Sequence, residues 1–248
     1  MRVDVFFGAA QLGPAEVGGR VVAVIDVLRA STTIAVALAN GAKAVIPFES
    51  SEEAVTRSKA FERRDVRLAG ERRMVAIPGF DFGNSPREFT REAVEGKTLL
   101  LATTNGTVAL TALQGARDVV VAAYVNLSAA LAMLRAAARG GTDVAVVCAG
   151  RERQFALEDA ACAGRLARLI ARRLPEAELN DAALASTMID RRFGDDLQRL
   201  FLASEHGKAL AEAGFADDLA VCAAVDSYPV LPIYQDRQIT KLGPQRER

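Results

Sequence analysis

The sequence predicts one α/β unit with three α/β/α layers around a largely parallel sheet that can include antiparallel strands. Short runs of β-branched and other apolar residues alternate along the chain with stretches rich in helix-forming residues, as in parallel sheets covered on both faces. Half of the 248 residues are apolar, which is enough for a large buried core. No clear linker divides the chain, so residues 1–248 are expected to form one unit, with an alternative boundary near Arg117.

Each expected strand is four or more apolar residues long and is followed by a turn and a helix. The polar turn Thr103–Gly106, for example, separates a strand from helix-forming residues. The expected strands are Val21–Ile25, Thr98–Ala102, Val119–Ala123 and Val144–Cys148, and the helices that follow them contain Ala35–Ala39, Val108–Leu113, Ser128–Ala138 and Ala156–Arg172.

Two stretches depart from this alternation. Ile77–Pro86 is rich in Gly, Pro and Asn, and it ends at a predicted helix start in which Ser85 caps the helix and Glu88 completes a capping box. Residues 180–214 show helical patterns without a strand and precede Leu219–Ala223. The polar tail after Tyr234 is expected to fray.

The charge balance and the lone histidine exclude several classes of function. The 31 basic and 31 acidic side chains cancel, so no net charge favours nucleic acid or an anionic membrane. The single histidine, His206, rules out the usual multi-histidine metal sites. It stands in a polar helical stretch, where we expect it to be solvated rather than catalytic.

Cysteine usage and hydropathy point to a cytoplasmic protein. Three widely spaced cysteines without a CxxC motif indicate reduced thiols. The N-terminal segment has no signal-peptide pattern, and no apolar run reaches the roughly 18 residues of a membrane helix. We therefore expect neither a membrane nor a nucleic-acid partner, and leave a homodimer open.

Polar residues gather where the predicted strands end, which is where ligands bind in open parallel sheets. After the first strand come a carboxylate, a guanidinium and three hydroxyls at a helix start, a set that suits phosphate and a metal ion. The alternative is that a hydroxyl caps the helix and the carboxylate pairs with the guanidinium. These residues are Asp26, Arg29, Ser31, Thr32 and Thr33.

Two later strand ends offer further polar groups. Thr104, Asn105 and Gly106 form a turn that either caps a helix or binds a ligand. Arg151 and Arg153 follow the strand at residues 144–148 and precede Glu158 and Asp159, which lie in the first turn of a helix. Carboxylates there are favoured by about 0.3–1 kcal/mol without any function, but with Asp26 they would also form an oxygen-ligand site for Mg²⁺.

Familiar nucleotide and hydrolase motifs are absent. The sequence has no GxxxxGK[ST] loop, no GxGxxG opening a helix and no GxSxG. Asp26-Val27-Leu28 also lacks the second aspartate of haloacid-dehalogenase phosphatases, which disfavours Asp26 as a phosphate-accepting nucleophile.

Four separated segments, in this order, resemble the 2-phosphosulfolactate phosphatase family. The resemblance implies an α/β fold and Mg²⁺-dependent release of phosphate from 2-phospho-3-sulfolactate, a step toward coenzyme M. It leaves open the substrate in this organism. The segments are Val24–Ile34 with Ala39–Ala42, Pro78–Pro86, Thr103–Thr107, and Cys148–Gly150 with Leu157–Asp159.

The resemblance suggests a role for each polar group. We expect a metal-bound water to attack in line with a carboxylate as base, while a covalent intermediate on Asp26 or Cys148 stays open. Mg²⁺ would be held by Asp26 with Glu158 or Asp159. The phosphoryl group would be bound by Arg29 and the amides near Ser31, Thr32 and Thr33, and the sulfonate or carboxylate by Arg151 or Arg153. The substrate oxygens would be oriented by Asn84, Ser85, Thr104, Asn105 and Gly106.

Two alternatives remain open at this point. Asp26, Lys97 and Cys148 mimic the order of the catalytic residues in isochorismatase-like cysteine hydrolases, although Lys97 precedes its strand instead of lying within it. The other alternative is an anion-binding protein without catalytic activity. Metal chelation would abolish the activity of the phosphatase, whereas thiol alkylation would abolish that of the cysteine hydrolase.

Overall fold

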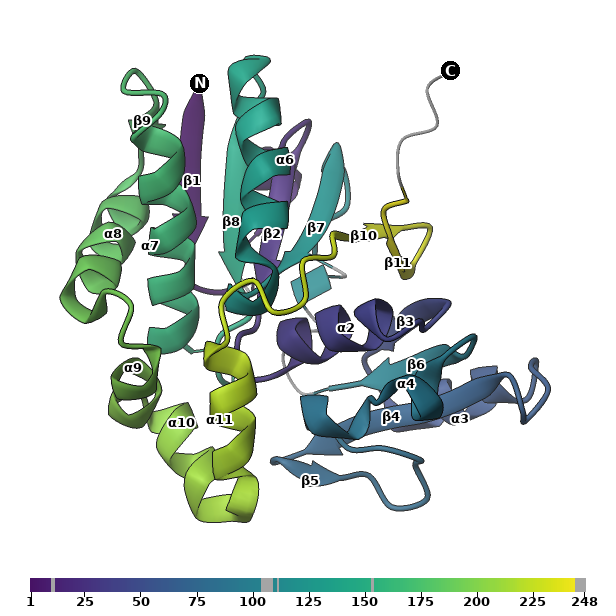
Figure 1. Ribbon diagram of the computed structural model, residues 1–248. Helices are drawn as coiled ribbons and strands as arrows, with labels where there is room; N and C mark the ends of the chain where they lie inside the picture. Colours follow the sequence, from purple (N-terminus) through teal and green to yellow (C-terminus); the bar gives the residue numbers. More distant parts are fainter. Residues whose placement is uncertain (10–11, 104–108, 111, 153, 244–248) are drawn as a thin grey trace.

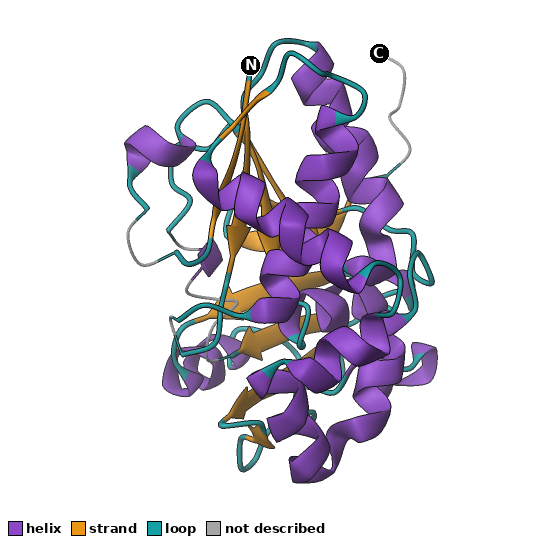
Figure 2. Ribbon diagram, turned by 90° about the vertical axis from the view of Figure 1, so that its left-hand side faces the viewer, coloured by secondary structure: helices purple, strands orange, loops and turns teal. Residues whose placement is uncertain are grey.

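The computed structural model has three layers, with helices on both faces of one mixed sheet (Figures 1 and 2), as the sequence predicts. It describes residues 1–9, 12–103, 109–110, 112–152 and 154–243. Within these residues the sheet has the strand order β5-β4-β6-β3-β11-β10-β7-β2-β8-β1-β9. The strands are β1 Arg2–Phe6, β2 Val21–Ile25, β3 Ala44–Phe48, β4 Val66–Arg72, β5 Val75–Ala76, β6 Thr98–Ala102, β7 Asp118–Ala122, β8 Val144–Cys148, β9 Glu178–Leu179, β10 Pro232–Gln235 and β11 Gln238–Lys241.

The sheet contains two parallel blocks. Strands β9, β1, β8, β2 and β7 form the larger block, and β3, β6 and β4 form the smaller one. The hairpin β10–β11 joins them, because β10 pairs antiparallel with β7 and β11 pairs antiparallel with β3. In Figure 1 the larger block stands upright and the smaller one lies across the view, so the sheet turns sharply between them.

The β10–β11 hairpin corrects the prediction that the tail after Tyr234 frays. Asp236 and Arg237 form its two-residue turn, and both have positive φ, at 51° and 61°. This is the backbone of a type I′ turn, whose twist matches that of the flanking strands. Asn-Gly is the usual signal for such a turn, and its absence explains why the sequence pattern missed the hairpin.

The sheet separates two hydrophobic cores because successive side chains of a strand point to opposite faces. On β2, Val21, Ala23 and Ile25 pack with helices α6 (Leu127–Arg139) and α7 (Leu157–Ala171). Val22 and Val24 pack in the second core, which includes helix α2 (Ala30–Ala39). Both faces of β2 are therefore buried, as its continuous apolar run predicts.

The expected helices are present where the structure describes them. Residues 180–214 contain helices and no strand, as predicted, and Asn180 caps helix α8 (Asp181–Phe193) by accepting a hydrogen bond from the Ala183 amide. No helix in the described part of the chain has the length and apolarity to cross a bilayer. The remaining helices are α1 Pro14–Val17, α3 Ser51–Ser58, η1 Pro86–Glu88, α4 Arg91–Val94, η2 Tyr124–Asn126, α8 Asp181–Phe193, α9 Leu197–Ala203, α10 Glu205–Leu210, η3 Ala211–Phe215 and α11 Ala216–Ala223.

The capping box predicted at Ser85 is wrong. The segment forms only the single turn η1, and no side-chain hydrogen bond caps it. The Ser85 hydroxyl instead donates to Asp218 on α11, and Glu88 accepts from the Gly83 amide. The Ser85 hydroxyl therefore bonds to Asp218, which is distant in the sequence, instead of capping the helix.

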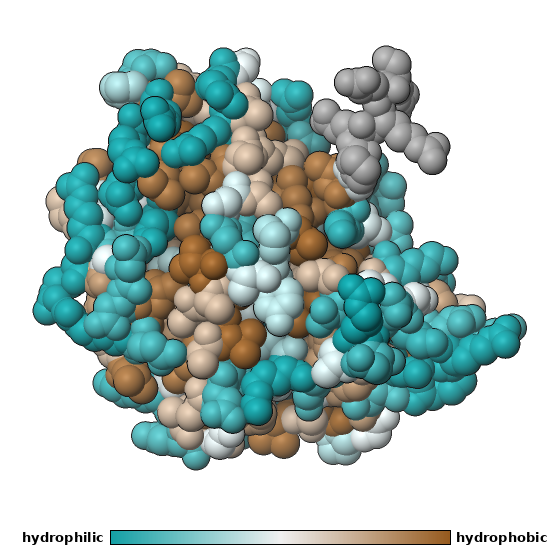
Figure 3. All heavy atoms as spheres, viewed as in Figure 1, coloured by the Kyte–Doolittle hydropathy of each residue, from teal (hydrophilic) through white to brown (hydrophobic). Residues whose placement is uncertain are grey.

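The surface is mixed in character. In the face shown in Figure 3, hydrophilic side chains cover the outer sides of the molecule, including α8 at one side and α3 and α4 at the other. The zero net charge therefore conceals many charged groups, whose local arrangement decides what the protein can bind.

Candidate active site

A polar cavity of about 260 Å³ lies beyond the carboxyl ends of β2, β6 and β8. Strand ends of this kind form the ligand sites of open α/β sheets. The cavity also brings the two parallel blocks together, because β6 belongs to the smaller block and β2 and β8 to the larger. Its lining residues are Asp26, Leu28, Arg29, Glu71, Arg73, Met74, Asn84, Thr103, Arg151, Glu152 and His206.

Asp26 is held in place by the start of helix α2. Its Oδ1 accepts a hydrogen bond from the Ala30 amide at 3.1 Å, and its own amide donates to Ser31 Oγ at 2.9 Å. Burial raises the pKa of Asp26 to about 6, while nearby His206 and the Ala30 amide lower it and nearby Glu71 raises it further. Its Oδ2 accepts no hydrogen bond from the described residues, so this oxygen can bind a ligand.

Asp159 connects two of the loops that form the site. Its Oδ1 accepts from the Val27 amide at 2.9 Å, and its Oδ2 accepts from the Gly150 amide at 3.0 Å. Burial, followed by the charges of Glu158 and Asp26, raises the pKa of Asp159 well above its usual range despite these two amides. Both of its oxygens fix the backbone, and it does not line the cavity.

His206 contacts Glu158, and the expectation of a solvated histidine is wrong. The His206 side chain is 13% exposed, and its Nδ1 lies 3.1 Å from Glu158 Oε1. Glu158 Oε2 is buried and has no hydrogen-bond partner among the described residues. The helical excursion that contains α10 therefore brings the only histidine of the chain to the edge of the sheet.

Arg29 is fixed by a buried ion pair. Its Nη1 donates to Asp218 Oδ2 at 2.7 Å, and both side chains are almost fully buried. The other oxygen of Asp218 accepts from the Ser85 hydroxyl at 2.7 Å. The Arg29 guanidinium also lies 4.3 Å from the centre of the Phe215 ring. Asp218 thus holds Arg29 and the 77–86 loop together.

The three hydroxyls after Arg29 lie beneath the cavity wall. Ser31 Oγ accepts from the Asp26 amide, Thr32 donates to the Val27 carbonyl and Thr33 donates to the Asn84 carbonyl. All three residues are buried and none lines the cavity. In this structure they shape the loop, and their expected contact with a phosphoryl group stays a prediction.

Four of the expected ligand-binding residues lie at or beside the cavity. Asn84 and Arg151 line it, and Asn84 Oδ1 is buried without a hydrogen-bond partner among the described residues. Ser85 is buried next to Asn84 and bound to Asp218. Glu158 lines an adjoining hollow that shares Arg151 and His206 with the cavity. The candidates Thr104, Asn105, Gly106 and Arg153 lie outside the described residues.

Sequence reasoning missed the residues that the β4–β5 turn contributes. Glu71, Arg73 and Met74 line the cavity, and both Arg73 and Met74 have positive φ. Arg73 has no carboxylate within 4 Å among the residues that the structure describes. Adjacent arginines in a polar stretch give no periodic signal, so only the fold identifies Arg73 as a third arginine at this site.

Two carboxylate oxygens at the site are candidates for a Mg²⁺ ion that is shared with a substrate. No three His, Cys, Asp or Glu side chains in the described ranges form a cluster that could hold a metal ion. Magnesium, however, is commonly bound by one or two carboxylates together with substrate phosphate and water. Asp26 Oδ2 and the buried, unpartnered Glu158 Oε2 provide two such oxygens. Asp159, the third expected ligand, uses both oxygens on amides.

The cysteine-hydrolase alternative is not favoured by this geometry. Lys97 precedes β6 and thus lies at the amino end of that strand, whereas Asp26 and Cys148 lie at carboxyl ends. Burial, followed by nearby Asp159, raises the pKa of the Cys148 thiol well above its usual value. A nucleophilic cysteine needs the opposite shift.

The fold and this cavity define an α/β enzyme with arginines and carboxylates converging at the carboxyl ends of its strands. A family model described as 2-phosphosulpholactate phosphatase matches residues 9–237, and the chain belongs to the 2-phosphosulfolactate phosphatase family.

Relatives match over most of their length. A protein of Symbiobacterium thermophilum is 43% identical over 227 residues, 92% of this chain and 96% of the relative. One of Caldanaerobacter subterraneus subsp. tengcongensis is 38% identical over 85% of this chain and 86% of its own. One of Thermotoga maritima is 36% identical over 86% and 88%, respectively. Each carries the name "Probable 2-phosphosulfolactate phosphatase".

Proposed function

We propose that this protein is a phosphatase that hydrolyses 2-phospho-3-sulfolactate, or a similar small acidic phosphate ester, to the alcohol and phosphate. The observation that carries the proposal is the convergence of three arginines, Asp26 and His206 on one small cavity, with Glu158 bonded to His206 from the adjoining hollow. Family membership over nearly the whole chain supports the same reaction class.

The cavity holds one guanidinium group for each acidic group of the substrate, beside the carboxylates of Asp26, Glu71 and Glu152. A phosphosulfolactate carries phosphate, sulfonate and carboxylate groups, and Arg29, Arg73 and Arg151 supply three guanidinium groups. Guanidinium binds such oxyanions through paired N–H donors. Arg29, which follows β2 and is fixed by Asp218, is assigned to the phosphoryl group. Arg73 and Arg151 are assigned to the sulfonate and carboxylate.

Magnesium would be held by Asp26 and Glu158. When bound, it would neutralise charge on the phosphoryl oxygens and help to orient them. Asp159 would support this arrangement from behind, since it fixes the backbone at Val27 and Gly150. The buried Asn84 Oδ1, which lacks a donor among the described residues, would accept a hydrogen bond from substrate or water.

His206 is assigned as the proton carrier. A water oxygen forms the new bond to phosphorus while the bond from phosphorus to the ester oxygen breaks, and positioning supplies most of the catalysis. Glu158 orients the imidazole through Nδ1, so Nε2 takes the proton of the attacking water. The departing ester oxygen, on the opposite side of phosphorus, takes its proton from solvent, and His206 then releases its proton to solvent. Arg29 stabilises the negative charge on the transferred group.

Phosphate release from 2-phospho-3-sulfolactate tests the proposal. The purified chain is treated with EDTA, and phosphate is measured before and after Mg²⁺ is restored. We expect activity only with Mg²⁺, and weaker activity on 2-phospholactate, which lacks the sulfonate. If the ester binds but no metal restores release, the protein is an anion-binding protein. Loss of activity with iodoacetamide but not with EDTA would favour the cysteine hydrolase.

We also propose that the reaction takes place in the cytoplasm and leads toward coenzyme M. Family membership supports the pathway, and the cysteines support the compartment. Cys148, Cys162 and Cys222 are free and buried, which suits a reducing compartment.

A further inference from the structure

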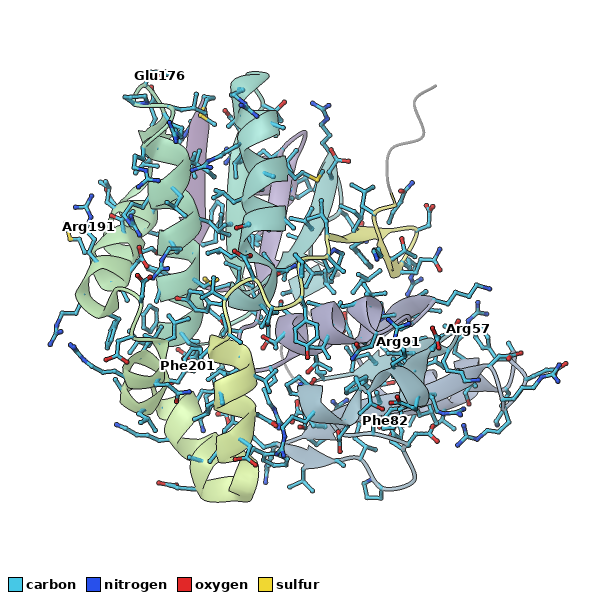
Figure 4. The ribbon with its side chains drawn as sticks, in the orientation of Figure 1. Arg57, Phe82, Arg91, Glu176, Arg191 and Phe201 are labelled. Carbon is cyan, nitrogen blue, oxygen red and sulfur yellow. The ribbon has the colours of Figure 1, made fainter. Side chains whose placement is uncertain are left out.

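A second basic cluster lies away from the candidate active site. Arg135 and Arg139 are one helical turn apart on α6, and Arg172 and Arg173 directly follow α7. A cavity of about 290 Å³ opens between the two helices and is lined by Arg135, Arg139, Arg173 and Leu174. In Figure 4, side chains that end in nitrogen atoms lie at the C-terminal ends of α6 and α7.

These four arginines lack acidic partners. None of them has a carboxylate within 4 Å among the residues that the structure describes. Two other arginines of α7 behave differently, since Arg165 and Arg168 both pair with Asp190. The difference is notable because the chain carries as many acidic as basic residues.

Among the four arginines, Arg135 bonds directly across the interface between α6 and α7. Its Nη2 donates to the Leu169 carbonyl of α7 at 2.8 Å, and its Nε is buried without an acceptor among the described residues. Burial, followed by the charges of Arg173, Arg172 and Arg139, lowers the pKa of Arg135. The arginines are therefore near enough to repel one another, and an anion between them would relieve that repulsion.

Helix termini explain only part of this arrangement. Cations at helix C-termini gain about 0.3–1 kcal/mol from the helix dipole, which accounts for basic residues at the ends of α6 and α7. Arg139, Arg172 and Arg173, however, form no side-chain hydrogen bonds to the terminal carbonyls in the described part of the chain. Capping therefore leaves their donors unused, and it does not account for the position of Arg139 and Arg173 at one cavity.

We infer that this cavity is a second anion site, which binds the phosphate group of a small molecule. Three guanidinium groups at the rim match the three or four oxygens of phosphate or a phosphate monoester. Helices α6 and α7 each flank parallel strands and run opposite to them, so their C-terminal ends lie at the amino edge of the sheet (Figure 1). The candidate active site lies at the carboxyl edge, so one ligand cannot occupy both.

Binding of inorganic phosphate tests the inference. Isothermal titration of the full chain is performed at low ionic strength, because exposed charges are screened within about 10 Å at 0.1 M salt. The double variant R139E/R173E is compared with R191E, which changes one exposed arginine of α8 labelled in Figure 4. Arg135 is left intact because it bonds to α7.

We expect R139E/R173E to bind one phosphate fewer per chain than wild type and R191E. The comparison counts the loss relative to the control, so it holds whether or not the candidate active site also binds phosphate. Phosphatase turnover at low phosphate should be unchanged in both variants. Equal stoichiometry in all three proteins would overturn the inference. Full displacement of phosphate by chloride at matched ionic strength would also overturn it, because it would indicate only a diffuse positive patch.

Discussion

The Nδ1 atom of His206 on α10 lies 3.1 Å from Oε1 of Glu158 at the start of α7. A carboxylate that binds one ring nitrogen selects the tautomer in which the other nitrogen can accept a proton. The pair therefore has the geometry of a base and its orienting group, formed by segments 48 residues apart.

Substitution of His206 should separate proton transfer from the orientation of Glu158. His206→Asn retains a donor near the Nδ1 position but has no proton acceptor at Nε2, so we expect kcat to fall about 10²–10⁴-fold with little change in Tm. Steady-state phosphate release and thermal unfolding provide the two readouts. If H206N retains wild-type kcat and pH profile, His206 only positions Glu158 and the base is a carboxylate.

Asp26→Asn should stabilise the metal-free protein at neutral pH while abolishing turnover. The amide retains an oxygen that can accept from the Ala30 amide, but it removes a buried charge. The folded pKa of Asp26, about 6, lies above the ordinary value of 3.8. Wild type therefore loses stability as pH rises from about 4 through 6, and the loss is complete above the folded pKa.

The size of this effect follows from the pKa difference. At about 1.4 kcal/mol for each pKa unit, the charged form of Asp26 costs roughly 3 kcal/mol at pH 7.5 and almost nothing at pH 3.5. Urea unfolding of both proteins in EDTA should reveal this widening gap. Added Mg²⁺ should raise the stability of wild type alone, and an equal Mg²⁺ response in the variant would remove Asp26 from the metal site.

Asp218→Ala should strongly destabilise the fold. It leaves the buried guanidinium of Arg29 without its counterion and the Ser85 hydroxyl without its acceptor. Loss of one member of a buried ion pair costs about 3–5 kcal/mol, which urea unfolding would measure. The neighbouring Asp217 is the matched control, because its ion pair with Arg87 is exposed. Asp217→Ala should change stability by about 1 kcal/mol or less, and equal effects would contradict the assigned role of Asp218.

Arg73→Gln should reduce specificity for a sulfonated substrate. A hydrogen bond to a charged group contributes about 1.5–3 kcal/mol, so kcat/KM for 2-phospho-3-sulfolactate should fall about 10–100-fold, mainly through KM. The value for 2-phospholactate should change less. Arg72 is the control, because its guanidinium bonds to the Glu71 and Glu49 carbonyls and it does not line the cavity. Equal losses on both substrates would rule out a sulfonate contact.

The fold class and the buried strands could be predicted from the sequence because their signal is local. Strands β2, β6 and β8 have the predicted bounds, since both of their faces are buried and every residue is apolar or small. The sequence does not predict strand β1, because Arg2 and Asp4 interrupt its apolar pattern. Asp4 is buried in that strand, where Arg20 binds it at 2.6 Å. Only the tertiary structure provides that counterion.

The candidate site is predictable only in part, because some of its residues are brought together only by the tertiary structure. Asp26 and Arg29 follow a recognisable strand, so the topology of a parallel sheet places them at the site. His206 and Asp218 lie on the helical excursion, and no rule of spacing relates them to a strand end. Their roles depend on how α10 and α11 fold back over the sheet, which the sequence pattern does not encode locally.

The β10–β11 hairpin also affects the order of events during synthesis. Its two strands are the last of the sheet to leave the ribosome, yet they occupy the middle of the strand order. Until then the larger and smaller blocks have no strand between them, and β7 and β3 each present an open edge. The edges of β7 and β3 therefore stay unpaired, and open to aggregation, until the hairpin is synthesised and pairs with both.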